Sequence, residues 1–230
     1  MNWASMDNSI KEPRIREQTL SNQIFEFEIS YSIKLFHKEM PKSPSFLEVL
    51  ESRKSERCFQ PLAFGELGEL FYYSCRTKQS ETNEAGLLIE KRNTPSPGAL
   101  HPILCLVTQL SSSEWFVYNS KTHSFDCPTF KEPEIELFKQ QCFEMIPNSG
   151  NAYLIWYVYD YEKLSAKYKN PDSLALRESG VLSATQGIIA QALGFSFCIL
   201  GIMGRDVASK LSNERSLIGV GAVLVGGASI

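Results

Sequence analysis

The sequence predicts an α+β fold in which helices flank a central, mostly antiparallel sheet. Three observations indicate it. Two segments with helical apolar spacing precede the strand-like segments, a long apolar helix pattern follows them, and the chain ends in a glycine-laced β run. The 230 residues, 43% of them hydrophobic, suit one compact domain.

The first residues read as an arm. Residues 1–22 are polar and lack apolar periodicity, so we expect a flexible N-terminal arm ahead of a single domain over residues 23–230. This stretch has charge where a signal peptide needs an apolar core, and no later apolar run reaches about 18 residues. The sequence therefore predicts a soluble, cytoplasmic protein with no membrane partner.

Two helices are expected before the sheet. In "SPSFLEVLESRKSERCF", Ser45 and Glu48 have the spacing of a capping box, and apolar residues follow at helical spacing. This helix ends at the basic segment 53–57. In "FGELGELFYYSC", Leu67, Leu70 and Phe71 fall on one stripe, which predicts a helix that faces the core.

The strand-like segments come next. "ILCLVTQL" and "SEWFVYNS" are rich in β-branched and aromatic residues, and the serines between them suit a hairpin turn. "AYLIWYVYDY" is apolar almost throughout, which predicts a central strand covered on both faces.

The last third combines a helix and a strand. "ESGVLSATQGIIAQALGF" has a wide apolar face, which predicts a helix buried within the domain or between two subunits. "LIGVGAVLVGGASI" reads as a β run, and because no helix can follow it the dinucleotide-binding fingerprint of a Rossmann unit is excluded.

Composition excludes several function classes. The net charge is -3 without a basic cluster among aromatics, so no nucleic-acid partner is expected. The six cysteines lack a C-x-x-C pair and read mostly as buried thiols. His37, His101 and His123 lie far apart without metal-site spacing, so no metal site is predicted.

The motif "RKSER" is the first candidate for ligand binding. It places Arg53, Ser55 and Arg57 where a helix ends and the chain turns. Two guanidinium groups and a hydroxyl that meet at one point would make a cradle for a phosphate. The alternative is a solvated helix end whose cations favour the C-terminal dipole.

Four segments together resemble a known family. "SFLEVLESRKSERCFQPLAFGELGELFYYS", "RNTPSPGALHPI", "EKLSAKYKN" and "SGVLSATQGIIAQALGFSFCILGIMG" occur in the order and approximate spacing of nitroreductase-like flavin enzymes. More narrowly, they resemble the SagB-type azoline dehydrogenases, which finish thiazole and oxazole rings on ribosomal peptides. The resemblance spans roughly residues 30–227. It implies a nitroreductase-like fold, an FMN cofactor and a homodimer with a long buried central helix.

The resemblance also implies cofactor-binding residues. Arg53, Ser55 and Arg57 would hold the ribityl phosphate and the polar pyrimidine edge of FMN. The backbone at Ile199, Leu200 and Gly201 would offer an N–H near the flavin N5. The alternative for these last residues is a buried strand end. The phosphate ligand set is incomplete, because few basic residues follow position 204.

The turn in "PSPGALHP" would contact the flavin of the neighbouring subunit. Pro95 fixes the backbone, and Gly98 allows a close approach, so that Ser96 and main-chain groups can face a flat ring. The alternative is an ordinary tight turn before a strand.

Lys167 and Tyr168 match the Lys-Tyr pair that azoline dehydrogenases place near the substrate. Oxidation of an azoline removes a proton from one carbon and a hydride from the next, so a base must stand beside the flavin. A desolvated lysine can serve, and a tyrosine can relay or position the proton. The alternative is a surface "KYK" in a polar stretch.

The expected function is therefore an FMN-dependent azoline dehydrogenase with hydride transfer to flavin N5. Its partners would be a second copy of the chain, a peptide substrate and cyclodehydratase proteins. Two alternatives stay open. One is an NAD(P)H-dependent nitro or quinone reductase, and the other is a non-catalytic flavin-fold scaffold in a peptide-modifying complex.

Overall fold

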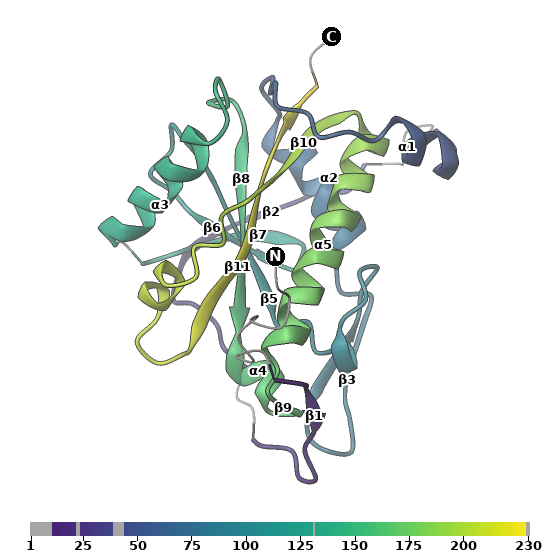
Figure 1. Ribbon diagram of the computed structural model, residues 1–230, viewed down its shortest axis with the longest axis vertical. Coiled ribbons are helices and arrows are strands. Elements are labelled where there is room, and N and C mark those ends of the chain that lie inside the picture. Colours follow the sequence, from purple (N-terminus) through teal and green to yellow (C-terminus); the bar gives the residue numbers. More distant parts are fainter. Residues whose placement is uncertain (1–10, 22–23, 39–43, 131, 229–230) are drawn as a thin grey trace, which may run out of the picture.

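A seven-stranded antiparallel sheet forms the centre of the molecule (Figure 1). The computed structural model describes residues 11–21, 24–38, 44–130 and 132–228. The strand order is β10-β11-β8-β5-β6-β7-β2, and every neighbouring pair is antiparallel. The strands are β2 (Ile29–Lys34), β5 (Ile103–Gln109), β6 (Phe116–Asn119), β7 (Ser124–Pro128), β8 (Tyr153–Asp160), β10 (Phe195–Leu200) and β11 (Leu217–Gly227).

Helices and two small sheets surround this centre. The helices are α1 (Phe46–Ser52), α2 (Phe64–Ser74), α3 (Pro133–Glu144), α4 (Tyr161–Ser165) and α5 (Asp172–Leu193), with 3-10 turns at Pro97–Ala99 and Val207–Leu211. The small sheets pair β1 (Arg14–Ile15) with β9 (Tyr168–Lys169) and β3 (Gln79–Thr82) with β4 (Leu88–Lys91). The α+β prediction is confirmed.

The sheet separates two hydrophobic cores. Side chains from α2 and α5 cover one face, where they meet Tyr157 and Tyr159 of β8. Side chains from α3 cover the other face, where they meet Trp156 and Val158. Figure 1 shows these helices on opposite sides of the sheet. Every residue of β8 is buried, so the prediction of a central strand covered on both faces is confirmed.

The two helices and the hairpin that the sequence predicts are present at the predicted positions. The capping box of α1 is present, because the Ser45 N–H donates to Glu48 and the Glu48 N–H donates to the Ser45 hydroxyl. The stripe of α2 is buried, and β5 and β6 form the expected antiparallel pair. Of the six free cysteines, all but Cys58 are buried.

Helix α5 connects the two ends of the domain. It has 22 residues and ends at Gly194, which adopts the left-handed conformation common after a helix (φ 73°). Strand β10 follows at once. One side of α5 faces the core, whereas Gly180, Val181 and Ala184 are exposed.

Part of the expected arm contacts the body. Residues 1–10 and 22 lie outside the described residues, but β1 pairs with β9, and the N–H groups of Arg16 and Leu20 donate to the carbonyls of Lys167 and Ala166. Residues 14–20 are thus held against the strand that bears Tyr168. Among the described helices, none has the length and hydrophobicity needed to cross a membrane.

Candidate functional site

The basic segment after α1 is pinned to the edge strand β10. The Glu56 N–H donates to the Phe197 carbonyl (3.0 Å). Arg53, Ser55 and Arg57 are exposed, and within the described residues their side chains have no hydrogen-bond or ion-pair partner. The structure therefore leaves the donors of the predicted phosphate cradle available to a ligand.

The end of β10 lies beside this segment and has an open edge. Strand β10 pairs only with β11 in the sheet. Because Phe197 directs its carbonyl outward to Glu56, the alternation of an antiparallel strand directs the N–H of Ile199 to the same open edge. Ile199 is 55% exposed, whereas Leu200 is buried. The structure therefore joins segment 53–57 to the strand that leads to residues 199–201.

The turn at residues 95–101 has a strained backbone. Gly98, Ala99 and His101 adopt left-handed conformations, with φ values of 63°, 57° and 48°. Such values are uncommon for residues other than glycine and are maintained by surrounding structure. The Ser96 hydroxyl points inward and donates to the Glu178 carboxylate (2.7 Å), rather than outward to a ligand.

Lys167 and Tyr168 meet the same turn. A Cβ on Gly98 would lie 2.8 Å from the Lys167 Nζ and 2.9 Å from the Tyr168 hydroxyl. Both side chains are half-buried, and burial raises the pKa of Tyr168. Glycine at position 98 thus leaves just enough room for an amine and a phenol that come from a distant part of the sequence.

A buried network of charged residues supports the turn from below. Glu90 pairs with Arg92 (2.6 Å) and lies 3.8 Å from Lys163, whose Nζ also donates to the His101 carbonyl (3.1 Å). His101 Nδ1 lies 4.0 Å from the Glu178 carboxylate. The turn is therefore connected to β4, α4 and α5 at once.

Burial is the main cause of the pKa shifts of His101, Lys163 and Glu178 in this network. It lowers the pKa of His101 to about 3 and that of Lys163 to about 8. It raises the pKa of Glu178 to about 7, against the opposing effects of the Ser96 hydroxyl and of Arg92. His101 is thus a neutral imidazole at neutral pH, and Glu178 titrates near neutrality.

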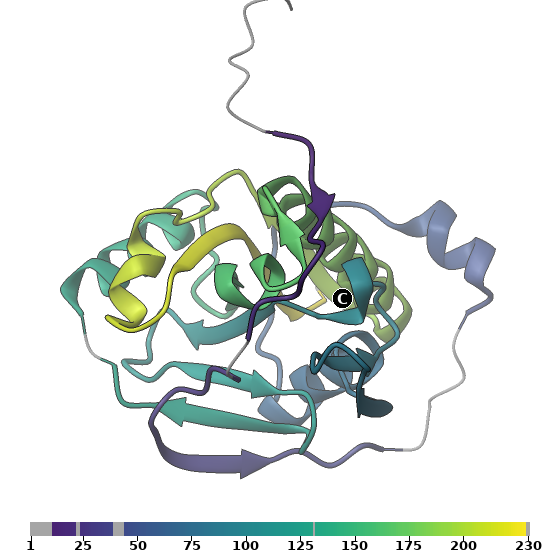
Figure 2. The same ribbon diagram turned by 90° about the horizontal axis from the view of Figure 1, so that it is seen from below.

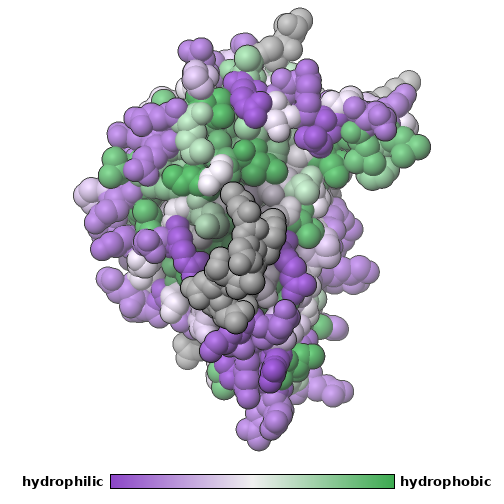
Figure 3. All heavy atoms as spheres, viewed as in Figure 1, coloured by the Kyte–Doolittle hydropathy of each residue, from purple (hydrophilic) through white to green (hydrophobic). Residues whose placement is uncertain are grey.

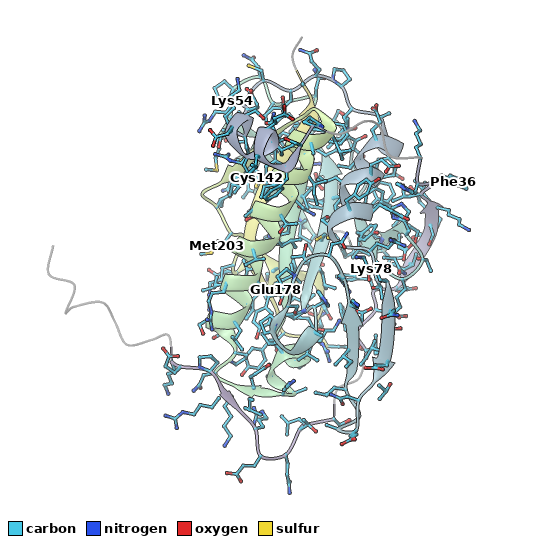
Figure 4. All side chains as sticks on the ribbon, turned by 90° about the vertical axis from the view of Figure 1, so that its right-hand side faces the viewer. Phe36, Lys54, Lys78, Cys142, Glu178 and Met203 are labelled. Atoms are coloured by element: carbon cyan, nitrogen blue, oxygen red, sulfur yellow. The ribbon has the colours of Figure 1, made fainter. Side chains whose placement is uncertain are left out.

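The predicted site residues form two groups at opposite ends of α5. The exposed segment 53–57 and β10 lie at its C-terminal end, and the turn with Lys167 and Tyr168 lies at its N-terminal end. Figure 4 shows Lys54 beside the first group and Glu178 beside the second. About 22 Å of helix separates Glu178 from Leu193. One chain does not bring the two groups to a single ligand.

A groove runs along the turn of the second group, and the described residues that line it do not include Lys167 or Tyr168. It has a volume of about 630 Å³ and lies between the β3–β4 hairpin and residues 94–101. This volume is within the range of about 300–1,000 Å³ typical of ligand sites. Ser96 and Ala99 of the turn line it, together with Arg92 and His101.

The three basic residues beyond position 204 differ in whether their side chains form an ion pair. Arg215 forms a bidentate pair with Asp160 (2.8 and 2.9 Å), and Lys210 lies 3.9 Å from Glu134. Arg205 is exposed. Of the three, Arg205 is the one whose side chain has no partner among the described residues.

Sequence reasoning missed the charged residues of the network. Glu178 begins a segment whose apolar pattern drew attention to its hydrophobic face, and Glu90, Arg92 and Lys163 lie in polar stretches. One signal was available. A carboxylate at the buried face of an otherwise apolar helix is rarely tolerated without a partner.

Comparison with known proteins identifies the fold. No protein-family model matches the chain, and no curated protein matches it. Among solved structures, a candidate nitroreductase from Ralstonia eutropha JMP134 is similar with a TM-score of 0.63 and 14% identity, over 93% of this chain and 98% of that one.

Two further structures are similar at a TM-score of 0.55. A candidate NAD(P)H:FMN oxidoreductase from Staphylococcus epidermidis ATCC 12228 has 13% identity, over 84% of this chain and 91% of that one. A chain of the E. coli microcin synthetase McbBCD complex with truncated pro-MccB17 bound has 16% identity, over 91% of this chain and 79% of that one. The chain therefore has the nitroreductase-like fold that its motifs predict.

Proposed function

We propose that this protein is an FMN-dependent oxidoreductase and, within that class, an azoline dehydrogenase that oxidises thiazoline or oxazoline rings in a ribosomally made peptide. The observation that carries the proposal is the meeting of the Lys167 amine and the Tyr168 hydroxyl at Gly98. An amine and a phenol held together at one turn suit proton removal from a bound substrate. The likeness to a microcin synthetase complex that holds a truncated pro-peptide supports a peptide substrate.

The residues at the C-terminal end of α5 fit FMN. The side chains of Arg53, Ser55 and Arg57, which have no partner among the described residues, supply donors for a phosphate, since a guanidinium matches phosphate oxygens in a bidentate way. The outward N–H of Ile199 suits a flavin edge. When bound, FMN supplies an acceptor for a hydride.

A homodimer would join the two groups of residues. In a two-fold dimer, each copy gives its turn, with Lys167 and Tyr168, to the segment 53–57 of the other copy. Apolar residues at α1 support such a contact, because Phe46 and Leu47 are 64% and 71% exposed. Figure 2 shows α1 projecting from the body, and Figure 3 shows hydrophobic residues gathered over it at the upper right.

The chain's own residues would handle the proton. Conversion of an azoline to an azole removes a hydride from one ring carbon and a proton from its neighbour, a two-electron oxidation. Lys167 accepts the proton at its Nζ, and the Tyr168 hydroxyl orients the ring by a hydrogen bond. The strained turn keeps both groups at one point. For turnover, an external oxidant such as molecular oxygen would have to take up the two electrons removed from the ring.

The test begins with the visible spectrum of the purified protein and the ratio of released FMN to chain. We expect near-stoichiometric FMN. Azole formation on a synthetic thiazoline peptide is then compared between the wild type and Lys167→Ala, and a loss of at least about 100-fold is expected for the removal of a general base. Full activity of Lys167→Ala with normal FMN content would remove the catalytic role.

A second candidate is an NAD(P)H-dependent nitro or quinone reductase. It is favoured by the likeness to the candidate NAD(P)H:FMN oxidoreductase. It predicts fast bleaching of the flavin spectrum by NAD(P)H without oxygen, whereas the azoline dehydrogenase predicts bleaching by the thiazoline peptide. A protein that takes up no FMN after reconstitution would instead be a scaffold.

A further inference from the structure

One buried carboxyl lies directly beneath the turn at residues 95–101. Glu178 is 5% exposed and stands in the second turn of α5 (Figure 4). Its Oε2 accepts a hydrogen bond of 2.7 Å from the Ser96 hydroxyl, and the Ser96 oxygen accepts one of 2.8 Å from the His101 N–H. A single carboxyl thus acts on both ends of the loop that encloses Gly98.

The turn needs this support. Ala99 and His101 are held in left-handed conformations that an L-residue rarely adopts, and such a backbone persists only where its surroundings over-determine it. The chain from Ser96 to His101 is closed by the Ser96 oxygen rather than by a strand ladder. The orientation of Ser96 therefore helps to set the shape of the turn, together with the hydrogen bond from the Ala99 N–H to the Ser96 carbonyl (3.1 Å).

Several titratable groups surround Glu178. They are His101 in the turn, Glu90 and Arg92 beside β4, Lys163 in α4, Cys75 after α2 and Cys105 in β5. His101 is neutral, because burial lowers its pKa to about 3. Arg92 and Lys163 are both drawn to Glu90. Arg92 and Lys163 act on Glu178 through their charges without forming an ion pair with it among the described residues. Burial therefore dominates and raises the pKa of Glu178 to about 7.

We propose that Glu178 is the positioning residue of the flavin-facing turn and that its ionisation sets the affinity of the site for FMN. This inference rests on the proposed function and adds the regulation of the same site. The ionised carboxylate makes a charge-assisted bond to Ser96, which is stronger than the bond made by the neutral acid. Protonation loosens the turn, so the affinity falls as the pH falls through about 7.

The test measures FMN dissociation constants by flavin fluorescence from pH 5.5 to 8.5. The wild type should weaken about tenfold more than Glu178→Gln over this range, the factor expected between a charged and a neutral hydrogen bond. The difference between the two proteins is the decisive quantity, because the phosphate of FMN titrates near pH 6 in both.

A double-mutant cycle separates positioning from general stability. Ser96→Ala and Glu178→Gln should be non-additive, so that the double variant binds FMN no more weakly than Ser96→Ala alone. Ser183→Ala is the matched control. This substitution removes a buried hydroxyl of α5 that donates within the helix to the Gly180 carbonyl and, among the described residues, makes no hydrogen bond to the turn. It should keep the wild-type pH profile.

A second measurement needs no FMN. Amide hydrogen exchange of His101 in the protein without flavin should accelerate in both Ser96→Ala and Glu178→Gln, because the Ser96 acceptor is lost or misdirected. Unchanged protection together with an unchanged pH profile would overturn the positioning role. A wild type that binds no FMN would defeat the proposed function, whereas the His101 exchange rate would still decide whether Glu178 holds the turn.

Discussion

At Gly98, the candidate site depends on the absence of a Cβ atom. Its φ of 63° favours glycine, and an added Cβ would meet Lys167 and Tyr168 at under 3 Å. We expect Gly98→Ala to lose about 1–2 kcal/mol of unfolding free energy from the backbone conformation. It should also displace both functional groups and reduce azole formation. Urea unfolding and turnover of the thiazoline peptide measure the two effects.

Gly86 provides a control for the backbone effect. Its φ is 77°, yet a Cβ there would have nothing within 4 Å. Gly86→Ala should therefore show the same loss of stability with normal turnover. Equal turnover in the two alanine variants would mean that crowding at Gly98 does not affect Lys167 and Tyr168.

Glu178 should make stability depend on pH. Its pKa is about 7 in the folded protein and near 4.5 in the unfolded chain, so ionisation costs more free energy in the folded state. The free energy of unfolding is therefore highest below pH 4.5, where the carboxyl is protonated in both states, and it falls as the pH rises through 7. The loss is about 3 kcal/mol. Urea unfolding at pH 5 and pH 8 should show this loss for the wild type and not for Glu178→Gln. An equal pH effect in the two proteins would contradict it.

Sequence reasoning named residues whose local pattern carries a distinct physical requirement. Gly98 was named because glycine allows a close approach, and the structure gives it a left-handed backbone; Lys167 and Tyr168 were named by their motif, and their catalytic role stays a prediction. The approach of Lys167 to Gly98 joins residues about 70 positions apart, so spacing alone could not reveal it. Nor could it reveal that Ser96 turns inward to Glu178.

At the scale of elements, α1 is short and exposed, so its cap should decide how firmly it presents Arg53. Loss of the Ser45 cap costs about 1 kcal/mol of helix stability. Ser45→Ala should weaken FMN binding several-fold, because fraying of α1 frees the phosphate cradle, and leave the urea midpoint nearly unchanged. Flavin titration and unfolding measure both.

Ser52→Ala is the control for this helix. Among the described residues, the Ser52 hydroxyl donates to the Glu48 and Val49 carbonyls in the last turn of the helix, and it caps no N–H group at the start of the helix. It should bind FMN as the wild type does. If Ser45→Ala binds equally well, the position of Arg53 is fixed by the hydrogen bond from Glu56 to β10 rather than by α1.

The elements that sequence reasoning did not predict lack strong periodicity. Strand β2 is exposed at nearly every position, β9 has two residues, and β3 is fully exposed. Their pairing is decided by partners distant in sequence, such as β7 for β2. By contrast, β8 and β11 are buried and read directly as strands.

At the scale of the molecule, α5 separates the two groups of candidate residues, so under the proposed function one chain alone would leave the site incomplete. The helix is long enough to span the domain, and its exposed side is small and apolar at Gly180, Val181 and Ala184. A self-complementary contact along such a side brings opposite ends of two antiparallel helices together. The proposed assembly and the proposed chemistry therefore depend on the same surface.

This dependence gives the last prediction. Val181 is 40% exposed, and Val181→Glu would place a charge in the proposed contact, where burial without a partner is costly. The wild type should sediment at twice the 25.9 kDa of one chain, and Val181→Glu at a single chain with its FMN lost. Leu137→Glu, at a 56% exposed position of α3 on the other side of the sheet, should remain dimeric and keep FMN. A wild-type monomer with bound FMN would show that one chain completes the site alone.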